Sequence, residues 1–181
     1  MITIIGLQGM PLVRQGDNLS QLIVDAAEKQ KIALQNGDIL IITQKIVSKA
    51  EGRICALTDI VPSDFALRIA EGTGRDPRHV EIILRESSKA VKMKDHHLIM
   101  ETRHGFVCAN AAVDRSNVEG EDEVSLLPVD PDASAERIRR GIGERLGVDI
   151  AVIISDTWGR AWRCGQVNSV IGVSGMRPFK D

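Results

Sequence analysis

Short runs of β-branched and other apolar residues divide the chain into predicted strands. Such runs are found at residues 2–5, 38–43 and 150–154. The run 150–154 contains no charged residue, and the run 38–43 contains only Asp38, at its start. Runs of this length and composition are typical of strands, and continuous apolarity predicts burial on both faces. Residues 167–173 form one more apolar run, interrupted by a glycine.

Between these runs, apolar residues recur at the spacing of amphipathic helices. The first such segment carries Leu19, Leu22, Ile23, Ala26 and Ala27, with Asp17 or Asn18 as the expected cap. Further helices are expected to begin at Ser63, at Asp76-Pro77 and at Asp132, and the last is expected to close at Gly147.

The pattern changes between residues 89 and 109, where three short apolar stretches predict an antiparallel meander. The stretches are 90–91, 98–100 and 106–109, and His104-Gly105 is the expected turn before the last of them. Helices and strands therefore alternate without a strict βαβ series. The predicted class is α+β or mixed α/β, with mixed sheets and an antiparallel component.

Composition narrows the classes of partner and compartment. The 181 residues are 43% apolar and 27% charged, with a net charge of −2, three cysteines and no tyrosine. Neither nucleic acid nor a membrane is an expected partner, because net positive charge, stacking aromatics and long apolar stretches are lacking. Three scattered cysteines and an N-terminus without signal-peptide features favour the cytoplasm.

The end of the predicted strand 150–154 is the first candidate for chemistry. Ser155, Asp156 and Thr157 follow it, and Arg160 and Arg163 come a few residues later. A strand end that presents oxygen ligands suits a hard cation, and arginines suit phosphate. The alternative is that Asp156 caps a turn or helix, and this segment alone favours the cap.

A second carboxylate follows the predicted strand 106–109, in the segment NAAVDRSN. Asp114 lies there with Ser116 and Asn117. If Asp114 and Asp156 met in space, they could share one or two Mg²⁺ or Mn²⁺ ions, which prefer oxygen ligands. The alternative is an Asx turn, and the sequence does not show whether the two segments meet.

Two further segments are candidates for binding phosphate. Lys45 and Lys49 follow the predicted strand 38–43, where α/β sheets tend to bind ligands, although surface lysines are the common alternative. Gln8-Gly9-Met10-Pro11 matches neither nucleotide-binding glycine fingerprint, and a tight turn without ligand is favoured there. Arg103 or His104 could lie at the edge of a site, but no catalytic histidine is assigned.

Four segments, taken together, resemble one family: GLQGMPLVRQGDNL, GDILIITQKIVSKAEGR, ETRHGFVCANAAVDRSNV and LLPVDPDASAERIR with VIISDTWGRAWRCGQ. The chain resembles the coenzyme F-420-0 gamma-glutamyl ligases throughout its length. The resemblance implies a mixed α/β fold, a homodimer and a GTP-dependent enzyme that adds L-glutamate to coenzyme F-420-0. It also implies Mg²⁺ or Mn²⁺, as two ions, with K⁺ as a further candidate cofactor.

The resemblance also implies roles for single residues. Asp114 and Asp156 look like ligands of one divalent ion, and Thr157 looks like a ligand of a second. The positions that match contacts to GTP are Gln8, Gly9, Met10, Pro11, Gln44, Lys45, Lys49 and Asn117. The implied mechanism is phosphoryl transfer to the precursor's carboxylate, which gives an acyl phosphate that the amine of glutamate attacks.

Family members continue beyond the last residue of this sequence. The resemblance therefore implies that residues 1–181 are the N-terminal and central part of one ligase domain. Two other functions stay open. One is a non-catalytic fragment that binds GTP and metal or dimerises. The other, a metal-dependent phosphohydrolase, has no support from the four segments.

Overall fold

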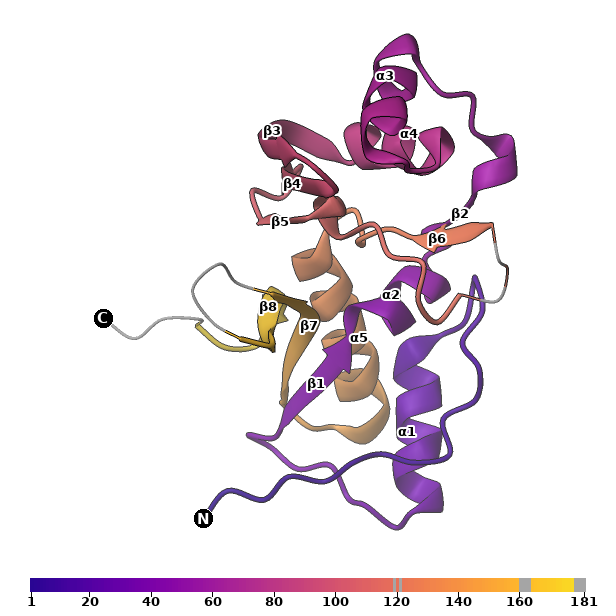
Figure 1. Cartoon of the computed structure of the whole chain (residues 1–181). Helices are drawn as coiled ribbons and strands as arrows, with labels where there is room; N and C mark the ends of the chain where they lie inside the picture. The colour runs from indigo at the N-terminus through magenta and orange to yellow at the C-terminus, as the bar shows by residue number, and fades with distance from the viewer. Residues whose placement is uncertain (119, 121, 160–163, 178–181) are drawn as a thin grey trace. The chain divides into compact units, whose positions relative to one another are not determined.

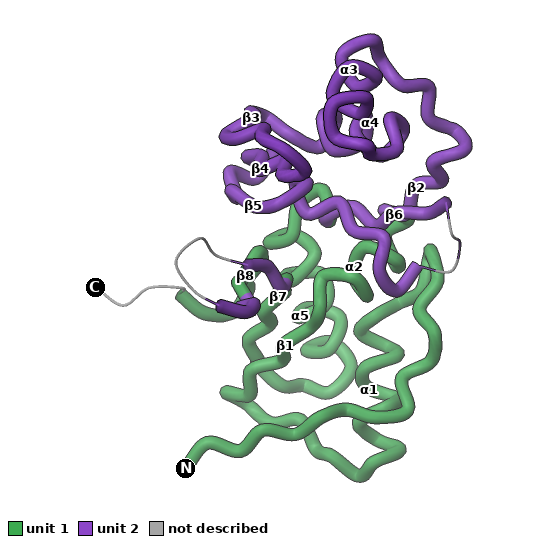
Figure 2. Tube along the Cα trace, viewed as in Figure 1, with its two compact units in different colours: residues 1–52, 128–156, 169–181 green, residues 53–127, 157–168 purple. Residues whose placement is uncertain are grey.

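The structure is a computed structural model that describes residues 1–118, 120, 122–159 and 164–177. The chain divides into two compact units, and Figure 2 colours them separately. Unit 1 comprises residues 1–52, 128–156 and 169–181, and unit 2 comprises residues 53–127 and 157–168. Each unit is built around packed helices and strands of its own.

Unit 1 contains a parallel strand pair and three helices (Figure 1). Strand β1 (Ile39–Thr43) pairs in parallel with β7 (Ala151–Gly159), and β8 (Gln166–Ser174) follows in the strand order β1-β7-β8. The helices are α1 (Leu19–Lys29), α2 (Gln44–Ala50) and α5 (Pro131–Leu146). Strands β7 and β8 also contribute residues to unit 2.

The termini of α1 and α5 follow from their capping residues. Asn18 accepts a hydrogen bond from the main-chain N–H of Gln21 at the start of α1, as its sequence predicts. Asp130 caps α5 in the same way, so this helix begins at Pro131 and not at the expected Asp132. Gly147 ends α5 in the left-handed conformation, which glycine adopts without strain.

Helices α1 and α5 pack closely because one of the contacting residues is a glycine. A Cβ at Gly141 of α5 would lie 2.3 Å from Oγ and 2.8 Å from Cβ of Ser20 in α1. Such distances are shorter than van der Waals contact, so only glycine fits at this point of the helix pair. Ile23, Ala27, Ile138 and Ile142 are among the buried residues of these two helices.

Unit 2 contains two antiparallel sheets and two α-helices (Figure 1). Strand β2 (Ile54–Ala56) pairs with β6 (Glu123–Ser125). The predicted meander is confirmed as β3 (Ser87–Lys94), β4 (His97–Thr102) and β5 (Val107–Ala109). Helices α3 (Asp64–Thr73) and α4 (Pro77–Arg85) begin at the predicted caps Ser63 and Asp76. Two short 3-10 helices, η1 (Leu57–Asp59) and η2 (Asn110–Ala112), complete the unit.

The core of unit 2 lies between these helices and the meander. Its buried residues include Val80 and Ile83 of α4, Met100 of β4 and Val124 of β6. In the described residues, the mixture of parallel and antiparallel strands with five α-helices confirms the predicted α+β class. None of the helices in the described part of the chain is both long and apolar enough to cross a membrane.

Three further expectations about single elements are wrong. Residues 2–5 form no strand, and Ile2 and Ile4 are more than nine-tenths exposed. A β-branched run forms a stable strand only when a neighbouring strand accepts its hydrogen bonds, and residues 2–5 pair with none in the described structure. The strand from Asp38 to Thr43 is not buried on both faces. β1 is an edge strand that exposes Ile39 and Ile41 on one face and buries Ile42 on the other.

The third correction concerns the strand 150–154. It does not stop before Ser155, because β7 continues to Gly159. The sequence also did not predict α2, which replaces the surface turn considered for Lys45 and Lys49. The apolar run 167–173 lies in strand β8.

Candidate functional site

The parallel pair of unit 1 places two candidate segments at adjacent strand positions. Thr43, the last residue of β1, is in register with Ser155 of β7. Gln44 and Lys45, which begin α2, follow Thr43, and Asp156 follows Ser155. The carboxyl ends of parallel strands are where open α/β sheets bind ligands. The structure thus brings a candidate phosphate-binding segment and a candidate metal ligand to neighbouring strands.

Asp156 does not cap a turn or helix, so the alternative first favoured for it is wrong. It lies within β7, where it is half-buried. The neighbouring Thr157 is exposed and its hydroxyl donates a hydrogen bond to Oδ1 of Asn168, 2.5 Å away. Arg160 and Arg163 lie outside the described residues.

Helix α2 orders the two candidate lysines. Lys45 and Lys49 are four residues apart, hence on one face of the helix, and both are half-buried. The side chain of Gln44 is 1% exposed, and Ser48 Oγ lies 3.5 Å from its Oε1. A nucleotide contact by Gln44 would therefore come from its main-chain N–H, which has no partner within the helix at this position.

The segment Gln8–Pro11 lies at the far end of α1 from α2. Gln30, at the carboxyl end of α1, donates a hydrogen bond from Nε2 to the carbonyl oxygen of Gln8 over 2.8 Å. At the other end of α1, Gly16 N donates to the carbonyl oxygen of Ala50 at the end of α2. Gly9 has a φ of 71°, which explains a glycine at this position.

Asp114 lies in unit 2, where its main chain and side chain are both hydrogen-bonded. It exchanges two main-chain hydrogen bonds with Ser125, of 3.0 and 2.8 Å. Its carboxylate accepts from N and Oγ of Ser116, at 2.8 and 2.9 Å. The Asx turn considered from the sequence is therefore present. A carboxylate has about four lone-pair sites, so an Asx turn by itself does not exclude a cation.

Asn117, the candidate nucleotide contact nearest to Asp114, is exposed and has a φ of 57°. Asparagine tolerates this left-handed conformation better than most residues. Asp114 belongs to unit 2 and Asp156 to unit 1.

The turn that leads to Asp114 is strained, and sequence reasoning missed it. Asn110, Ala111 and Ala112 have successive φ values of 55°, 51° and 59°. For residues other than glycine the left-handed conformation costs about 1–2 kcal/mol each, least for asparagine. Arg75 contacts this turn, because its Nη1 donates to Oδ1 of Asn110 over 2.9 Å. Strain of this kind persists only where surrounding contacts hold it.

His79 of α4 is a second group that the sequence did not single out. Burial lowers the pKa of His79 below its usual value, and the positive charges of Arg115 and Arg75 lower it further, against the effects of Asp76 and Asp114. Its Nε2 is buried without a hydrogen-bond partner in the described part of the chain. A lone histidine among charged residues gives no sequence pattern by which it could have been found.

The other residues considered for a site edge have structural contacts. Arg103 Nη2 donates to the carbonyl oxygen of Arg85 at the end of α4 over 2.7 Å. The ring of His104 stacks on Phe106 with 6.1 Å between centroids, and Phe106 in turn contacts Trp158. These contacts join the meander to its neighbours within unit 2.

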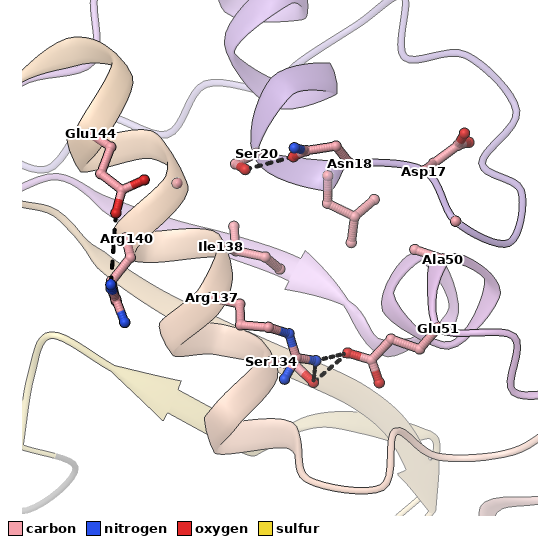
Figure 3. A pocket seen from close by; sticks show the side chains of 13 residues that line it. Asp17, Asn18, Ser20, Ala50, Glu51, Ser134, Arg137, Ile138, Arg140 and Glu144 are labelled. Carbon is pink, nitrogen blue, oxygen red and sulfur yellow. Dashed lines mark hydrogen bonds and ion pairs between the residues drawn. The ribbon is translucent and has the colours of Figure 1, made fainter.

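A pocket of about 520 Å³ lies in unit 1, away from these candidates (Figure 3). It is lined by the first residues of α1, the end of α2 and one face of α5. Four of its charged residues form two pairs: Glu51 accepts from Arg137, and also from Ser134, while Arg140 lies 3.8 Å from Glu144. Within the described residues, none of the candidate nucleotide or metal residues lines it.

The donor set fits a hard cation only with help from further ligands. Across the described residues, no group of three His, Cys, Asp or Glu side chains gathers. Carboxylates of Asp114 and Asp156 and the hydroxyl of Thr157 are oxygen donors. Mg²⁺ is commonly held by one or two carboxylates, with water and substrate phosphates completing the shell. Each of these residues, taken within its own unit, is of a type that suits such an ion.

Comparison with known proteins gives these candidates a context. The family described as F420-0:Gamma-glutamyl ligase matches residues 8–181. The chain belongs to this ligase family. It is 50% identical over 180 residues to the Coenzyme F420:L-glutamate ligase of Methanothermobacter thermautotrophicus, covering 99% of the chain and 71% of that protein.

Two other relatives carry the same name. The chain is 48% identical over 169 residues to the Coenzyme F420:L-glutamate ligase of Methanopyrus kandleri, covering 93% of the chain and 65% of the relative. The chain is 41% identical over 182 residues to the Coenzyme F420:L-glutamate ligase of Methanocaldococcus jannaschii, covering 99% of the chain and 70% of that relative. The chain therefore spans about two thirds of the length of these F420 ligases, and the family match includes every candidate site residue.

Proposed function

We propose that this protein is a ligase that joins L-glutamate to the deazaflavin precursor coenzyme F-420-0 through a gamma-glutamyl amide bond, using GTP. The family match over residues 8–181 and the shared name of its relatives support the reaction. The observation that carries the use of GTP is the register of Thr43 with Ser155. Thr43 and Ser155 are adjacent on parallel strands, and Lys45 and Asp156 follow them within two residues. Lysine is a residue type that binds phosphate, and aspartate is one that binds metal.

In this proposal the phosphates of the nucleotide lie against the start of α2. Lys45 and Lys49 neutralise the triphosphate as point charges from one helix face. The main-chain N–H of Gln44 adds a hydrogen bond. The other proposed GTP contacts are Gln8, Gly9, Met10, Pro11 and Asn117.

The metal ligands in this proposal are Asp114 and Asp156 for one divalent ion and Thr157 for a second, with K⁺ as a further candidate. When bound, Mg²⁺ or Mn²⁺ would offset the charge of the phosphate oxygens during transfer. Ser116 holds the Asp114 carboxylate in place, and Asn168 orients the Thr157 hydroxyl. Both contacts reduce the reorganisation that ligand binding requires.

The reaction then proceeds in two steps. A carboxylate oxygen of coenzyme F-420-0 attacks the γ-phosphorus of GTP, GDP leaves, and an acyl phosphate forms. The amine of glutamate attacks the acyl carbon, phosphate leaves with the bonding electron pair, and the amine loses a proton as the amide forms. The protein contributes mainly by positioning and by stabilising charge, as in other phosphoryl transfers.

A glutamylation assay tests this proposal. The full chain is incubated with coenzyme F-420-0, L-glutamate, GTP and Mn²⁺ or Mg²⁺, and the product is detected by mass spectrometry. Asp156→Asn should abolish product, and Lys45→Ala should raise the KM for GTP. Lys29→Ala, at an exposed lysine of α1, is the matched control and should behave as wild type.

The same assay separates the alternatives. Binding of GTP and Mn²⁺ in calorimetry without any product would support a non-catalytic nucleotide-binding or dimerisation fragment. GTP hydrolysis that needs neither glutamate nor precursor would support a phosphohydrolase. We also propose a homodimer located in the cytoplasm. The exposed Ile39 and Ile41 on edge strand β1 support an interface, and sedimentation analysis would test it.

A further inference from the structure

Three consecutive residues before Asp114 adopt a backbone conformation that their side chains disfavour. The φ values of Asn110, Ala111 and Ala112 all lie between 51° and 59°. Alanine gains nothing from this conformation, because its Cβ approaches the following carbonyl oxygen. The turn must therefore be held by contacts outside itself.

Packing holds the middle of the turn. Ala111 is 3% exposed and belongs to the hydrophobic cluster of unit 2, as does Val113, which is 4% exposed. Val113 N donates to the carbonyl oxygen of Asn110 over 2.9 Å and closes the turn. These contacts fix where the turn sits, but they do not fix the side chain of its first residue.

Arg75 holds that first residue. It follows Gly74, the left-handed cap of α3, and its guanidinium makes two hydrogen bonds to separate segments. Nη1 donates to Oδ1 of Asn110 over 2.9 Å, and Nη2 donates to the carbonyl oxygen of His96 over 2.7 Å. The guanidinium therefore ties the left-handed turn to the loop between β3 and β4.

The turn sets the direction in which the chain enters Asp114. Two residues after Ala112, Asp114 pairs with Ser125 of β6 through both of its main-chain groups, and Ser125 is 1% exposed. The carboxylate is then held by Ser116. The main chain of Asp114 is thus held by Ser125, and its carboxylate is held by Ser116. Contacts of this kind orient a metal ligand before the ion binds.

We infer that Arg75 is a positioning residue for the carboxylate of Asp114, and that it acts through Asn110 and the left-handed turn. This inference rests on the proposed role of Asp114 as a ligand of a divalent ion. Arg75 itself contacts neither metal nor substrate in this proposal. Its loss should weaken metal binding by the folded protein, by less than the roughly 10–100-fold that follows loss of a direct hydrogen-bond partner of a metal ligand.

The test is Mn²⁺ binding by the full chain, measured by calorimetry beside the melting temperature of each variant. Arg75→Leu removes both hydrogen bonds. Asn110→Gly removes only the amide that Arg75 binds, and glycine keeps the left-handed conformation accessible. Arg68→Gln, at an exposed arginine of α3, is the control and should bind Mn²⁺ as wild type does.

Each single variant is expected to weaken Mn²⁺ binding by up to about 10-fold, the lower end of the range for direct partners of a metal ligand. Because the two residues act through one hydrogen bond, Arg75→Leu with Asn110→Gly should lose much less than the product of the two single losses. Variants that melt at lower temperature yet bind Mn²⁺ as wild type would overturn the inference, because Arg75 would then only stabilise the fold. Multiplicative losses would also overturn it.

Asp114→Asn distinguishes this failure from failure of the proposed function. If Asp114→Asn weakens Mn²⁺ binding and the Arg75 and Asn110 variants do not, the positioning role alone is wrong. If Asp114→Asn itself binds Mn²⁺ as wild type, the proposed metal role of Asp114 is wrong and the positioning role falls with it.

Discussion

Replacement of Ala112 by glycine should leave stability unchanged or increase it, which is the opposite of the usual effect of this substitution. Ala112 has a φ of 59° and is half-buried. A left-handed alanine costs about 1–2 kcal/mol, and glycine removes that cost. Glycine loses about 0.5–1 kcal/mol through the greater freedom of the unfolded chain. The lost methyl group, half-buried, subtracts at most about 0.4 kcal/mol more.

The net change for Ala112→Gly is therefore close to zero, or a gain of up to about 1 kcal/mol. The matched control is Ala133→Gly, at an alanine of similar exposure in the first turn of α5, where the conformation is helical. That control should lose about 0.5–1 kcal/mol. The difference between the two variants, about 1–2 kcal/mol, is the quantity that the left-handed conformation predicts.

Urea denaturation followed by circular dichroism measures both variants against wild type. Equal m-values would show that the compared transitions expose the same surface. If Ala112→Gly lost as much free energy of unfolding as Ala133→Gly, the turn would not be strained at Ala112. The account of how the chain approaches Asp114 would then have to be abandoned.

Two further predictions concern packing and pH. Gly141→Ala should destabilise the protein by about 1 kcal/mol, because the new Cβ overlaps Ser20 and overpacking outweighs the gain in helix propensity. By contrast, Gly72→Ala in α3, where nothing lies within 4 Å, should stabilise it in the same melting experiment by about 0.5–1 kcal/mol. If Gly141→Ala were as stable as wild type, the close contact between α1 and α5 at this residue would be contradicted. Hydrogen bonds from Ser63, and to a lesser extent from Arg85, hold the pKa of Glu81 in the folded protein below its usual value. The stabilisation that Glu81 contributes is therefore fully present above its unfolded pKa of about 4.3. It is lost as the pH falls through the lower pKa of the folded state. The gap in unfolding free energy between wild type and Glu81→Gln should therefore shrink in acid, and a gap that is constant from neutral pH to pH 3 would refute the assignment.

The elements that the sequence predicted well are those whose ends depend on local chemistry. Asn18, Ser63 and Asp76 cap helices because their side chains accept hydrogen bonds from the first turn, and this signal lies within a few residues. The meander followed from short apolar stretches separated by a turn at His104-Gly105. Both kinds of element depend little on distant parts of the chain.

The elements that the sequence predicted poorly depend on distant contacts. Residues 2–5 have strand propensity but no neighbouring strand in the described structure. Alanine favours right-handed helix, so nothing local in Ala111 and Ala112 indicates a left-handed turn, which is held by Arg75 and by the core. For Asp156, the capping alternative failed because β7 continues beyond Ile154 to Gly159 and includes Asp156.

The candidate site could be predicted only in part for a related reason. Residue types and spacing indicated oxygen ligands and lysines. The register that puts Asp156 beside the strand preceding Lys45 is a property of the sheet and not of either segment. The role of Arg75 was also hidden, because Arg75 is 35 residues from Asn110 in the sequence.

The most direct test of the central claim is formation of glutamylated coenzyme F-420-0 by this chain. Wild-type protein is supplied with GTP, Mn²⁺, L-glutamate and coenzyme F-420-0, in parallel with Asp156→Asn and the Lys29→Ala control. The account predicts a product one glutamyl residue heavier from wild type and the control, dependent on GTP, and none from Asp156→Asn. Absence of product from wild type that binds GTP and Mn²⁺, or undiminished product from Asp156→Asn, would contradict it.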